Sequence, residues 1–232
     1  MSDINKNETP RRTRVKICGI RDVETARAVS EAGADYLGLN FVEKSPRFVD
    51  VVTARQIEDA LPESVEPIGL FCDHSVEHLL ATAAEAGLRT VQLHGHEIPE
   101  YAEQLDELQI LKVFGFNRVT LGGQLAEWKN HFDRMTALLI DTPPKPDAEI
   151  TGGTGEVFDW DSLSAMDFSG LPPVMLAGGL TPDNVGQAIR TVRPWAVDVS
   201  SGVESSRGVK DPAMIAAFCD AVREADASLG VE

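Results

Sequence analysis

The sequence has few cysteines, few aromatic residues and no long apolar segment. Its cysteines, Cys18, Cys72 and Cys219, are scattered over 232 residues without a CxxC pair. This spacing argues against a disulfide framework and favours a reducing compartment, so we expect a cytoplasmic protein. No apolar run reaches the roughly 18 residues of a membrane span. Residues 1–14 are polar and lack the apolar core of a signal peptide, so no membrane association is expected.

Basic residues are also scarce. The chain has 21 Lys and Arg against 37 Asp and Glu, which gives a formal net charge of −16 at pH 7. Binding to nucleic acid requires cations that neutralise the phosphates, so this charge argues against a nucleic-acid partner. We interpret the acidic excess as a feature that promotes solubility.

What the chain does contain is a regular alternation of short apolar runs and longer amphipathic runs. The runs expected to form strands are 15–18, 35–41, 67–72, 90–93, 110–114, 137–141, 174–177 and 196–199. The runs expected to form helices are 22–32, 53–60, 76–86, 99–108, 121–129, 160–166, 182–192 and 212–225. Continuous apolar strands are typical of parallel sheets that helices cover on the outside.

This alternation predicts the α/β class and a single (β/α)8 TIM barrel with eight parallel strands. A doubly wound open sheet is the alternative fold. We assign residues 15–225 to one barrel domain, 1–14 to a disordered N-terminal tail and 226–232 to a flexible C-terminal tail. Active sites of such barrels lie at the C-terminal ends of the strands, so the residues that end each strand are the candidates for function.

Two strand ends carry groups suited to acid–base chemistry. Cys18 ends the first strand, and Lys16 lies two residues earlier on the same face, where its ammonium would favour the thiolate. Asp141 ends the sixth strand after three apolar residues, and a carboxylate there is costly to bury without a partner. A buried inert cysteine and a loop-capping aspartate are the structural alternatives.

Glycine and serine are concentrated after the last three strands. The phosphate-binding candidates are Gly153, Gly178, Gly179, Ser200, Ser201 and Gly202. Such loops expose backbone N–H groups, and the loops after strands seven and eight often bind phosphate in this fold. Thr181 and Pro182 are expected to cap and begin the seventh helix.

Other strand ends supply polar candidates. Arg47 could hold a carboxylate through two hydrogen bonds, and Gln92 and His94 could form a polar wall for a substrate. A metal site built from His94, His96, His74 and Cys72 lacks any recognised ligand spacing, so we predict no metal.

Several stretches resemble the phosphoribosylanthranilate isomerase family. They include VKICGI (15–20), KSPRFV (44–49), LLIDT (138–142), LAGGLTPDNV (176–185) and AVDVSSGVESSRGVKD (196–211), and they follow one another in the family's order. Related barrels of histidine biosynthesis usually have an aspartate where this chain has Cys18. A histidine-pathway isomerase or a bifunctional variant, and a non-catalytic phosphate-binding barrel, remain the alternatives.

The resemblance implies an Amadori rearrangement in tryptophan biosynthesis that needs no cofactor. N-(5-phosphoribosyl)anthranilate would become 1-(2-carboxyphenylamino)-1-deoxyribulose 5-phosphate. Asp141 would be the general acid, Cys18 the general base, and Arg47 the partner of the anthranilate carboxylate, while Asp198 would contact the substrate's amine or hydroxyls. The expected partner is thus a small phosphorylated, carboxylate-bearing molecule, and the protein is expected to be a monomer or a homodimer.

Overall fold

The structure, a computed structural model, describes residues 12–142 and 158–230. Strands β1 to β8 form a closed barrel in the order of the sequence, and all neighbouring strands are parallel. The predicted (β/α)8 TIM barrel is therefore confirmed, and the open sheet is ruled out. The barrel strands are β1 Arg14–Cys18, β2 Tyr36–Asn40, β3 Glu66–Phe71, β4 Thr90–Leu93, β5 Gln109–Gly115, β6 Met135–Asp141, β7 Val174–Leu176 and β8 Ala196–Val199.

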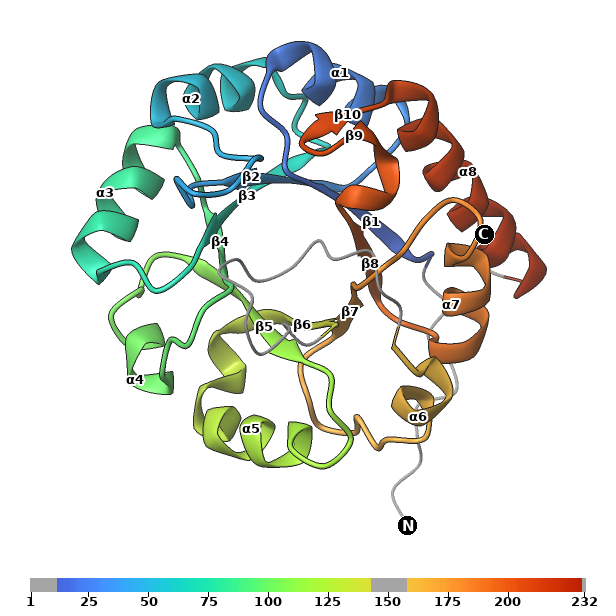
Figure 1. Cartoon of the computed structure of the whole chain (residues 1–232). Coiled ribbons are helices and arrows are strands. Elements are labelled where there is room, and N and C mark those ends of the chain that lie inside the picture. Colours follow the sequence, from blue (N-terminus) through green and yellow to red (C-terminus); the bar gives the residue numbers. More distant parts are fainter. Residues whose placement is uncertain (1–11, 143–157, 231–232) are drawn as a thin grey trace.

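Helices surround the ring of strands (Figure 1). They are α1 Val23–Glu31, α2 Val51–Ala60, α3 Val76–Ala86, α4 Pro99–Ala102, α5 Leu121–Trp128, α6 Trp160–Ser164, α7 Val185–Val192 and α8 Pro212–Ser228. Two 3-10 helices, η1 Lys129–Arg134 and η2 Ser201–Val203, and a small hairpin, β9 Glu204–Ser206 with β10 Val209–Lys210, complete the described elements. Among these, no helix is long and apolar enough to cross a membrane.

The period of two along each strand divides the barrel into an outer and an inner layer. Residues such as Val15 and Ile17 of β1 belong to the main apolar core, which the strands share with the helices. Residues on the opposite face, among them Leu111, Leu139 and Met175, form a second apolar cluster. Because side chains alternate along a strand, Lys16 and Cys18 lie on the opposite face from Val15 and Ile17 and point into the barrel.

Local capping explains where several helices begin. The side chains of Asp22, Asp50 and Ser75 each accept a hydrogen bond from the backbone N–H three residues later, at the start of α1, α2 and α3. These bonds satisfy N–H groups that have no partner inside a helix. Gly87 ends α3 with φ of 74°, a left-handed conformation that glycine adopts at little cost.

The fourth and seventh helices differ from the sequence prediction. The segment expected to be helical over 99–108 is an α-helix only over Pro99–Ala102. It continues in turns, in which the N–H of Leu105 bonds to the carbonyl of Ala102, and Leu105 is fully buried. The seventh helix begins at Val185 rather than at Pro182, and Asn184 takes the N-cap position instead of Thr181.

Both predicted tail boundaries also require correction. Helix α8 extends to Ser228, and the carboxylate of Asp226 is buried, where it accepts hydrogen bonds from the N–H and hydroxyl of Thr13. This contact ties the residue before β1 to helix α8. Residues 1–11 and 231–232 lie outside the described residues.

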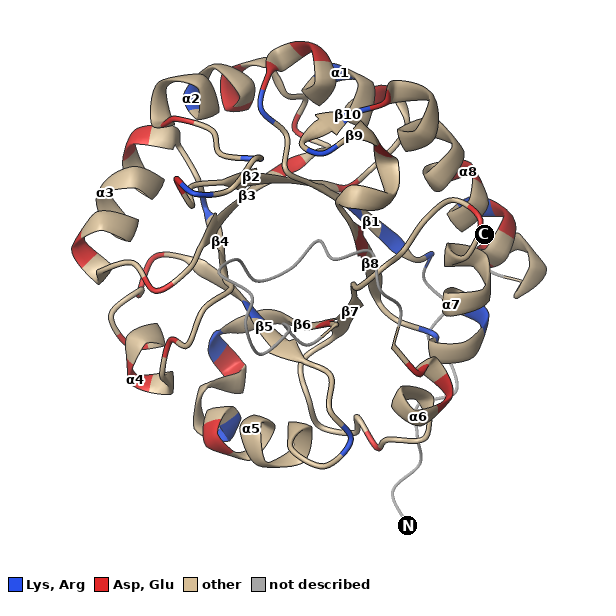
Figure 2. Cartoon of the chain, in the orientation of Figure 1, with Lys and Arg blue, Asp and Glu red and all other residues tan. Residues whose placement is uncertain are grey.

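Charged residues are spread around the outer ring of helices, with acidic positions on α3, α4 and α8 (Figure 2). The fully buried Lys16, by contrast, belongs to the inner layer of the barrel. A cation buried in this layer requires a partner of opposite charge.

Candidate active site

Cys18 lies at the C-terminal end of β1 and is buried, with 6% of its surface exposed. In the parallel pairing of β1 with β2 it faces Gly38. A Cβ on Gly38 would lie 2.7 Å from Cys18 Sγ, so the absence of a side chain at this position makes room for the thiol. Cys18 is thus packed against a strand that has no side chain next to its sulfur.

The pKa of the Cys18 thiol is raised above its ordinary value. Burial is the main cause, and the positive charge of Lys16 opposes it, as do Lys210 and Arg47. The expected effect of Lys16 on the thiolate is therefore present, but it is smaller than the effect of burial. Burial therefore favours the neutral thiol at neutral pH.

Lys16 forms a buried ion pair with Asp198 of β8. The distance from Nζ to Oδ1 is 2.9 Å, and the two residues are register partners in neighbouring strands. Although burial alone would lower the pKa of Lys16, the charge of Asp198 and its hydrogen bond give a net increase. The pair places one carboxylate and one ammonium inside the barrel beneath Cys18.

Asp141 ends β6 on the far side of the barrel interior and is also buried. Burial, together with the negative charge of Asp198, raises its pKa to about 7. A hydrogen bond of 2.7 Å from the N–H of Thr142 and the charge of Lys16 act in the opposite direction. Near neutral pH a substantial fraction of Asp141 therefore carries a proton that it can donate.

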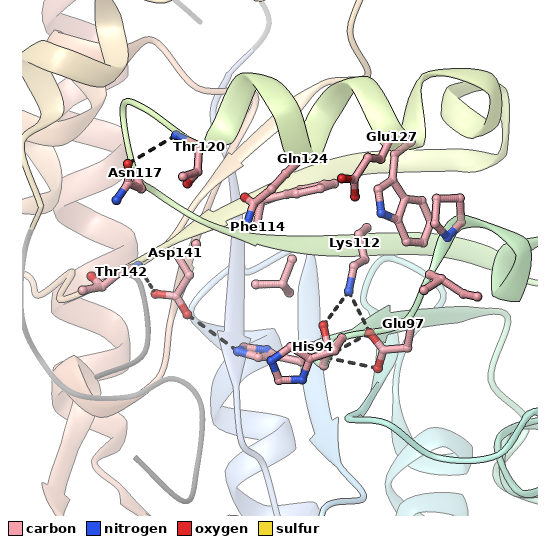
Figure 3. A pocket seen from close by; sticks show the side chains of 17 residues that line it. His94, Glu97, Lys112, Phe114, Asn117, Thr120, Gln124, Glu127, Asp141 and Thr142 are labelled. Carbon is pink, nitrogen blue, oxygen red and sulfur yellow. Dashed lines mark hydrogen bonds and ion pairs between the residues drawn. The ribbon is translucent and has the colours of Figure 1, made fainter. Parts of the chain in front are cut away.

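His94 follows β4 and faces Asp141, as Figure 3 shows. Its Nε2 lies 3.9 Å from Asp141 Oδ2, and its Nδ1 lies 2.8 Å from the amide nitrogen of Gln92. The hydrogen bond between Gln92 and Nδ1 holds the His94 ring in its orientation. Burial, helped by the charges of Lys16 and Lys112, lowers the pKa of His94 to about 3, so the ring is neutral.

The loops after β7 and β8 form one small hollow beside the acidic groups. Its lining includes Gly178, Gly179, Ser200 and Ser201 as well as Asp141 and Asp198. Gly178 and Gly179 have φ of 87° and 62°, which strongly favours glycine. A Cβ on Gly202 would overlap the carbonyl oxygen of Leu180, so this loop packs tightly on the preceding one. Gly153, the remaining phosphate candidate, lies outside the described residues.

Arg47 lies in the loop after β2 and is largely buried, with 8% of its surface exposed. Its guanidinium forms two hydrogen bonds with the carboxylate of Glu204, with Nε to Oε1 at 2.7 Å and Nη2 to Oε2 at 2.9 Å. Its aliphatic stem passes over Gly19, where a Cβ would lie 2.6 Å from Arg47 Cδ. Because Gly19 has no side chain, Arg47 can pass over it and reach the barrel mouth, which is the C-terminal end of the strands.

Comparisons with known proteins identify the family of the chain. A family model described as N-(5'-phosphoribosyl)anthranilate (PRA) isomerase matches residues 15–221. A relative from Pseudomonas fluorescens (strain SBW25), named N-(5'-phosphoribosyl)anthranilate isomerase, is 44% identical over 216 residues, which cover 93% of this chain and 98% of the relative. The chain belongs to the N-(5'-phosphoribosyl)anthranilate isomerase family.

Solved structures of the phosphoribosylanthranilate isomerase family share the fold. One, described as monomers generated from the dimeric enzyme of Thermotoga maritima, has a TM-score of 0.77 and 35% identity, and the match covers 91% of this chain and 99% of that one. A second is a complex with reduced 1-(o-carboxyphenylamino)-1-deoxyribulose 5-phosphate, with a TM-score of 0.77, 34% identity and the same coverage. The resemblance inferred from the sequence motifs is thus confirmed.

The structure of this family member also reveals functional candidates that the sequence analysis missed. Asn184 bridges the loop after β7, because its Oδ1 accepts a hydrogen bond from the N–H of Thr181 and its Nδ2 donates one to the carbonyl of Gly179. Glu204 is the second, since its contact with Arg47 spans 157 residues. Glu204 lies within the stretch 196–211 that resembles the family, and this resemblance was the one sign in the sequence that it matters. No local pattern in the sequence indicates that its partner is Arg47.

A larger cavity of about 450 Å³ opens beside His94 and Asp141, between the β4 loop and α5 (Figure 3). On its wall Lys112 forms a buried ion pair with Glu97 at 2.7 Å and donates to the carbonyl of Gly95. These contacts hold the loop that carries His94.

Among residues 12–142 and 158–230, no group of three or more His, Cys, Asp or Glu side chains is arranged to hold a metal ion. His74, one member of the metal site considered from the sequence, instead accepts a hydrogen bond on Nδ1 from the N–H of Cys72.

Proposed function

We propose that this isomerase converts N-(5-phosphoribosyl)anthranilate to 1-(2-carboxyphenylamino)-1-deoxyribulose 5-phosphate with Asp141 as general acid and Cys18 as general base. The observation that carries the assignment is the buried carboxyl of Asp141, whose pKa is raised to about 7 at the barrel end that also holds Cys18. A carboxyl that keeps its proton near neutral pH is what opening the sugar ring requires.

The rearrangement begins at the ring oxygen of the sugar. Asp141 donates its proton to that oxygen, the bond from the oxygen to C1 breaks, and the nitrogen lone pair forms an iminium at C1. The Cys18 thiolate, formed when the thiol releases its proton to water, then removes the proton from C2, and the electron pair of that C–H bond forms the enolamine. C1 regains a proton from the thiol while the C2 hydroxyl returns one to the Asp141 carboxylate, so the ketone forms with no net change in protons.

The raised pKa of Cys18 is compatible with its role as a base. A thiolate formed at a buried position is a stronger base than one at the surface, because the desolvated anion holds a proton more tightly. The iminium that follows ring opening adds a positive charge next to the sulfur, which favours ionisation at the step where the thiolate is needed. Lys16, Lys210 and Arg47 act in the same direction.

The polar groups around this pair suit the rest of the substrate. We assign the anthranilate carboxylate to Arg47 and the phosphate to the backbone amides of the loops that hold Gly178–Gly179 and Ser200–Gly202, with Gly153 as a further candidate. We assign contacts with the substrate's amine or hydroxyls to Asp198 and His94. Gln92 Oε1 is buried without a hydrogen-bond partner in the described part of the chain, which makes it an acceptor for a substrate hydroxyl.

The test is the loss of fluorescence of phosphoribosylanthranilate that is generated in situ, followed with the wild type and Cys18→Ser side by side. Rapid loss with the wild type alone supports both the reaction and the base. The aminoaldose of histidine biosynthesis serves as the second substrate, because turnover of it would identify a bifunctional variant. A folded wild type that leaves both substrates unchanged would support the non-catalytic phosphate-binding barrel and refute the proposal.

Two further expectations belong to this proposal. A catalytic thiol must stay reduced, so a cytoplasmic location suits the chemistry. Because the related Thermotoga maritima enzyme is described as a dimer, light scattering of the purified protein is the direct way to decide between a monomer and a homodimer.

A further inference from the structure

A buried carboxylate in the short hairpin after β8 holds two cations of the barrel mouth. Glu204 begins β9, and only 3% of its side chain is exposed. It accepts hydrogen bonds from Arg47 Nε and Nη2, from Lys210 Nζ at 2.8 Å, and from the N–H of Gly208 at 3.0 Å. These four hydrogen bonds hold the carboxylate in place between the hairpin and Arg47.

The bonds to Glu204 determine which edge of the Arg47 guanidinium is available. Nε and one hydrogen of Nη2 bond to Glu204, whereas Nη1 makes no hydrogen bond within the described residues. A guanidinium can bind a carboxylate along either of two edges, and here one edge is occupied. The edge formed by Nη1 and the second hydrogen of Nη2 therefore remains for a ligand.

The same carboxylate connects Arg47 to the Ser200 loop after β8 and to Cys18. Lys210 bonds to Glu204 and also to the carbonyl of Ser200 at 2.8 Å. The hydroxyl of Ser200 in turn donates to the carbonyl of Cys18 at 3.0 Å. Two cations share a single anion, so the cluster keeps a net positive charge, which suits a substrate with two anionic groups.

We propose that Glu204 is a positioning residue for the isomerase reaction, which orients the guanidinium of Arg47 and ties it through Lys210 to the Ser200 loop. The substrate's carboxylate and phosphate would then be held at a set spacing on either side of Cys18. This inference rests on the proposed role of Arg47. The hydrogen bonds of Glu204 also lower its pKa to about 2, so the carboxylate stays ionised over the working pH range.

The first test is a double-mutant cycle on the full-length protein with Glu204→Gln, Arg47→Ala and the combined variant. The fluorescence assay gives kcat and KM for each. We expect Glu204→Gln to raise KM at least about tenfold while kcat falls less, because a misoriented guanidinium weakens binding of the carboxylate. In the Arg47→Ala background the same change should alter KM by less than about twofold, since the residue through which it acts is gone.

Two further variants separate positioning from a general need for a buried charge. Glu204→Asp keeps the charge but withdraws the carboxylate by about one methylene, roughly 1.5 Å, so we expect KM to rise here as well. Asp226→Asn is the matched control, because Asp226 is also buried and accepts two hydrogen bonds, but from Thr13, the residue before β1 at the opposite end of that strand from Cys18. It should lower the melting temperature and leave KM unchanged.

The proposal is overturned if the KM effects of Glu204→Gln and Arg47→Ala multiply independently, or if Glu204→Asp has the KM of the wild type. If Glu204→Gln fails to fold, the comparison of Glu204→Asp with the wild type decides the question alone. An unchanged KM in Arg47→Ala would remove the carboxylate role and this inference with it. A wild type without turnover is a different result, because it refutes the proposed reaction itself.

Discussion

Replacing Asp141 with asparagine should stabilise the protein above neutral pH while it abolishes the reaction. The ordinary pKa of this carboxyl is 3.8, and burial with the charge of Asp198 raises it to about 7 in the folded protein. Below pH 3.8 the carboxyl is neutral in both the folded and the unfolded state. Between pH 3.8 and 7 the folded state binds more protons than the unfolded state, so the free energy of unfolding falls as pH rises.

The size of this effect follows from the interval between the two pKa values. Each pH unit in which only the folded state is protonated costs about 1.4 kcal/mol. Between pH 5 and pH 8.5 the wild type should therefore lose about 3 kcal/mol relative to Asp141→Asn, which carries no titrating group at this position. Over the whole interval from pH 3.8 to 7 the wild type loses about 4 kcal/mol of its free energy of unfolding, and the loss is complete once the pH exceeds 7.

Urea unfolding at pH 5.0, 7.0 and 8.5 for both proteins measures this difference. The free energy of unfolding of Asp141→Asn minus that of the wild type should rise between pH 5.0 and 7.0 and change little between pH 7.0 and 8.5, because the carboxyl is ionised in both states above pH 7. Asp50→Asn is a control of opposite sign, since the hydrogen bonds from Thr53 lower the pKa of Asp50 at the start of α2. Parallel pH profiles for the wild type and Asp141→Asn would refute the raised pKa, and an active Asp141→Asn would remove Asp141 from the mechanism.

Three other substitutions test the geometry of the mouth. Cys18→Ser should lower kcat by a factor of about 10³ or more and leave KM nearly unchanged, because a general base acts in the transition state; steady-state fluorescence kinetics measure both constants, and a similar kcat would exclude the base. Gly38→Ala should reduce kcat by about tenfold, since its Cβ would lie 2.7 Å from Cys18 Sγ and must displace the thiol; wild-type kcat would show that Sγ has room to move. Gly202→Ala should raise KM and lower stability by about 1–3 kcal/mol, because its Cβ would overlap the carbonyl of Leu180; thermal unfolding and KM together check this, and an unaltered KM would count against a phosphate site in this loop.

Much of the barrel followed from patterns within short segments. Eight apolar runs separated by amphipathic runs led to eight parallel strands in sequence order, because buried strands and half-buried helices have different periods. The errors lie where local signals compete with packing. The run 99–108 has a helical pattern, but it gives way to turns that bury Leu105. Asn184, rather than Thr181, takes the N-cap position of α7, and its side chain bonds to the N–H of Thr181 and the carbonyl of Gly179 in the preceding loop.

The sequence by itself determined which residues reach the barrel mouth. The strand period of two and the position of each strand end place Cys18, Asp141 and Asp198 on the inner face at one end of the barrel, and both rules depend only on neighbouring residues. The tertiary structure alone decided what those residues meet. Lys16 pairs with Asp198 across 182 positions, and Arg47 pairs with Glu204 across 157. The pKa of Asp141 likewise depends on burial and on the charge of Asp198, 57 positions away by their residue numbers. Electrostatic interactions depend on distance in space and on exclusion of water, and neither exists until the barrel closes.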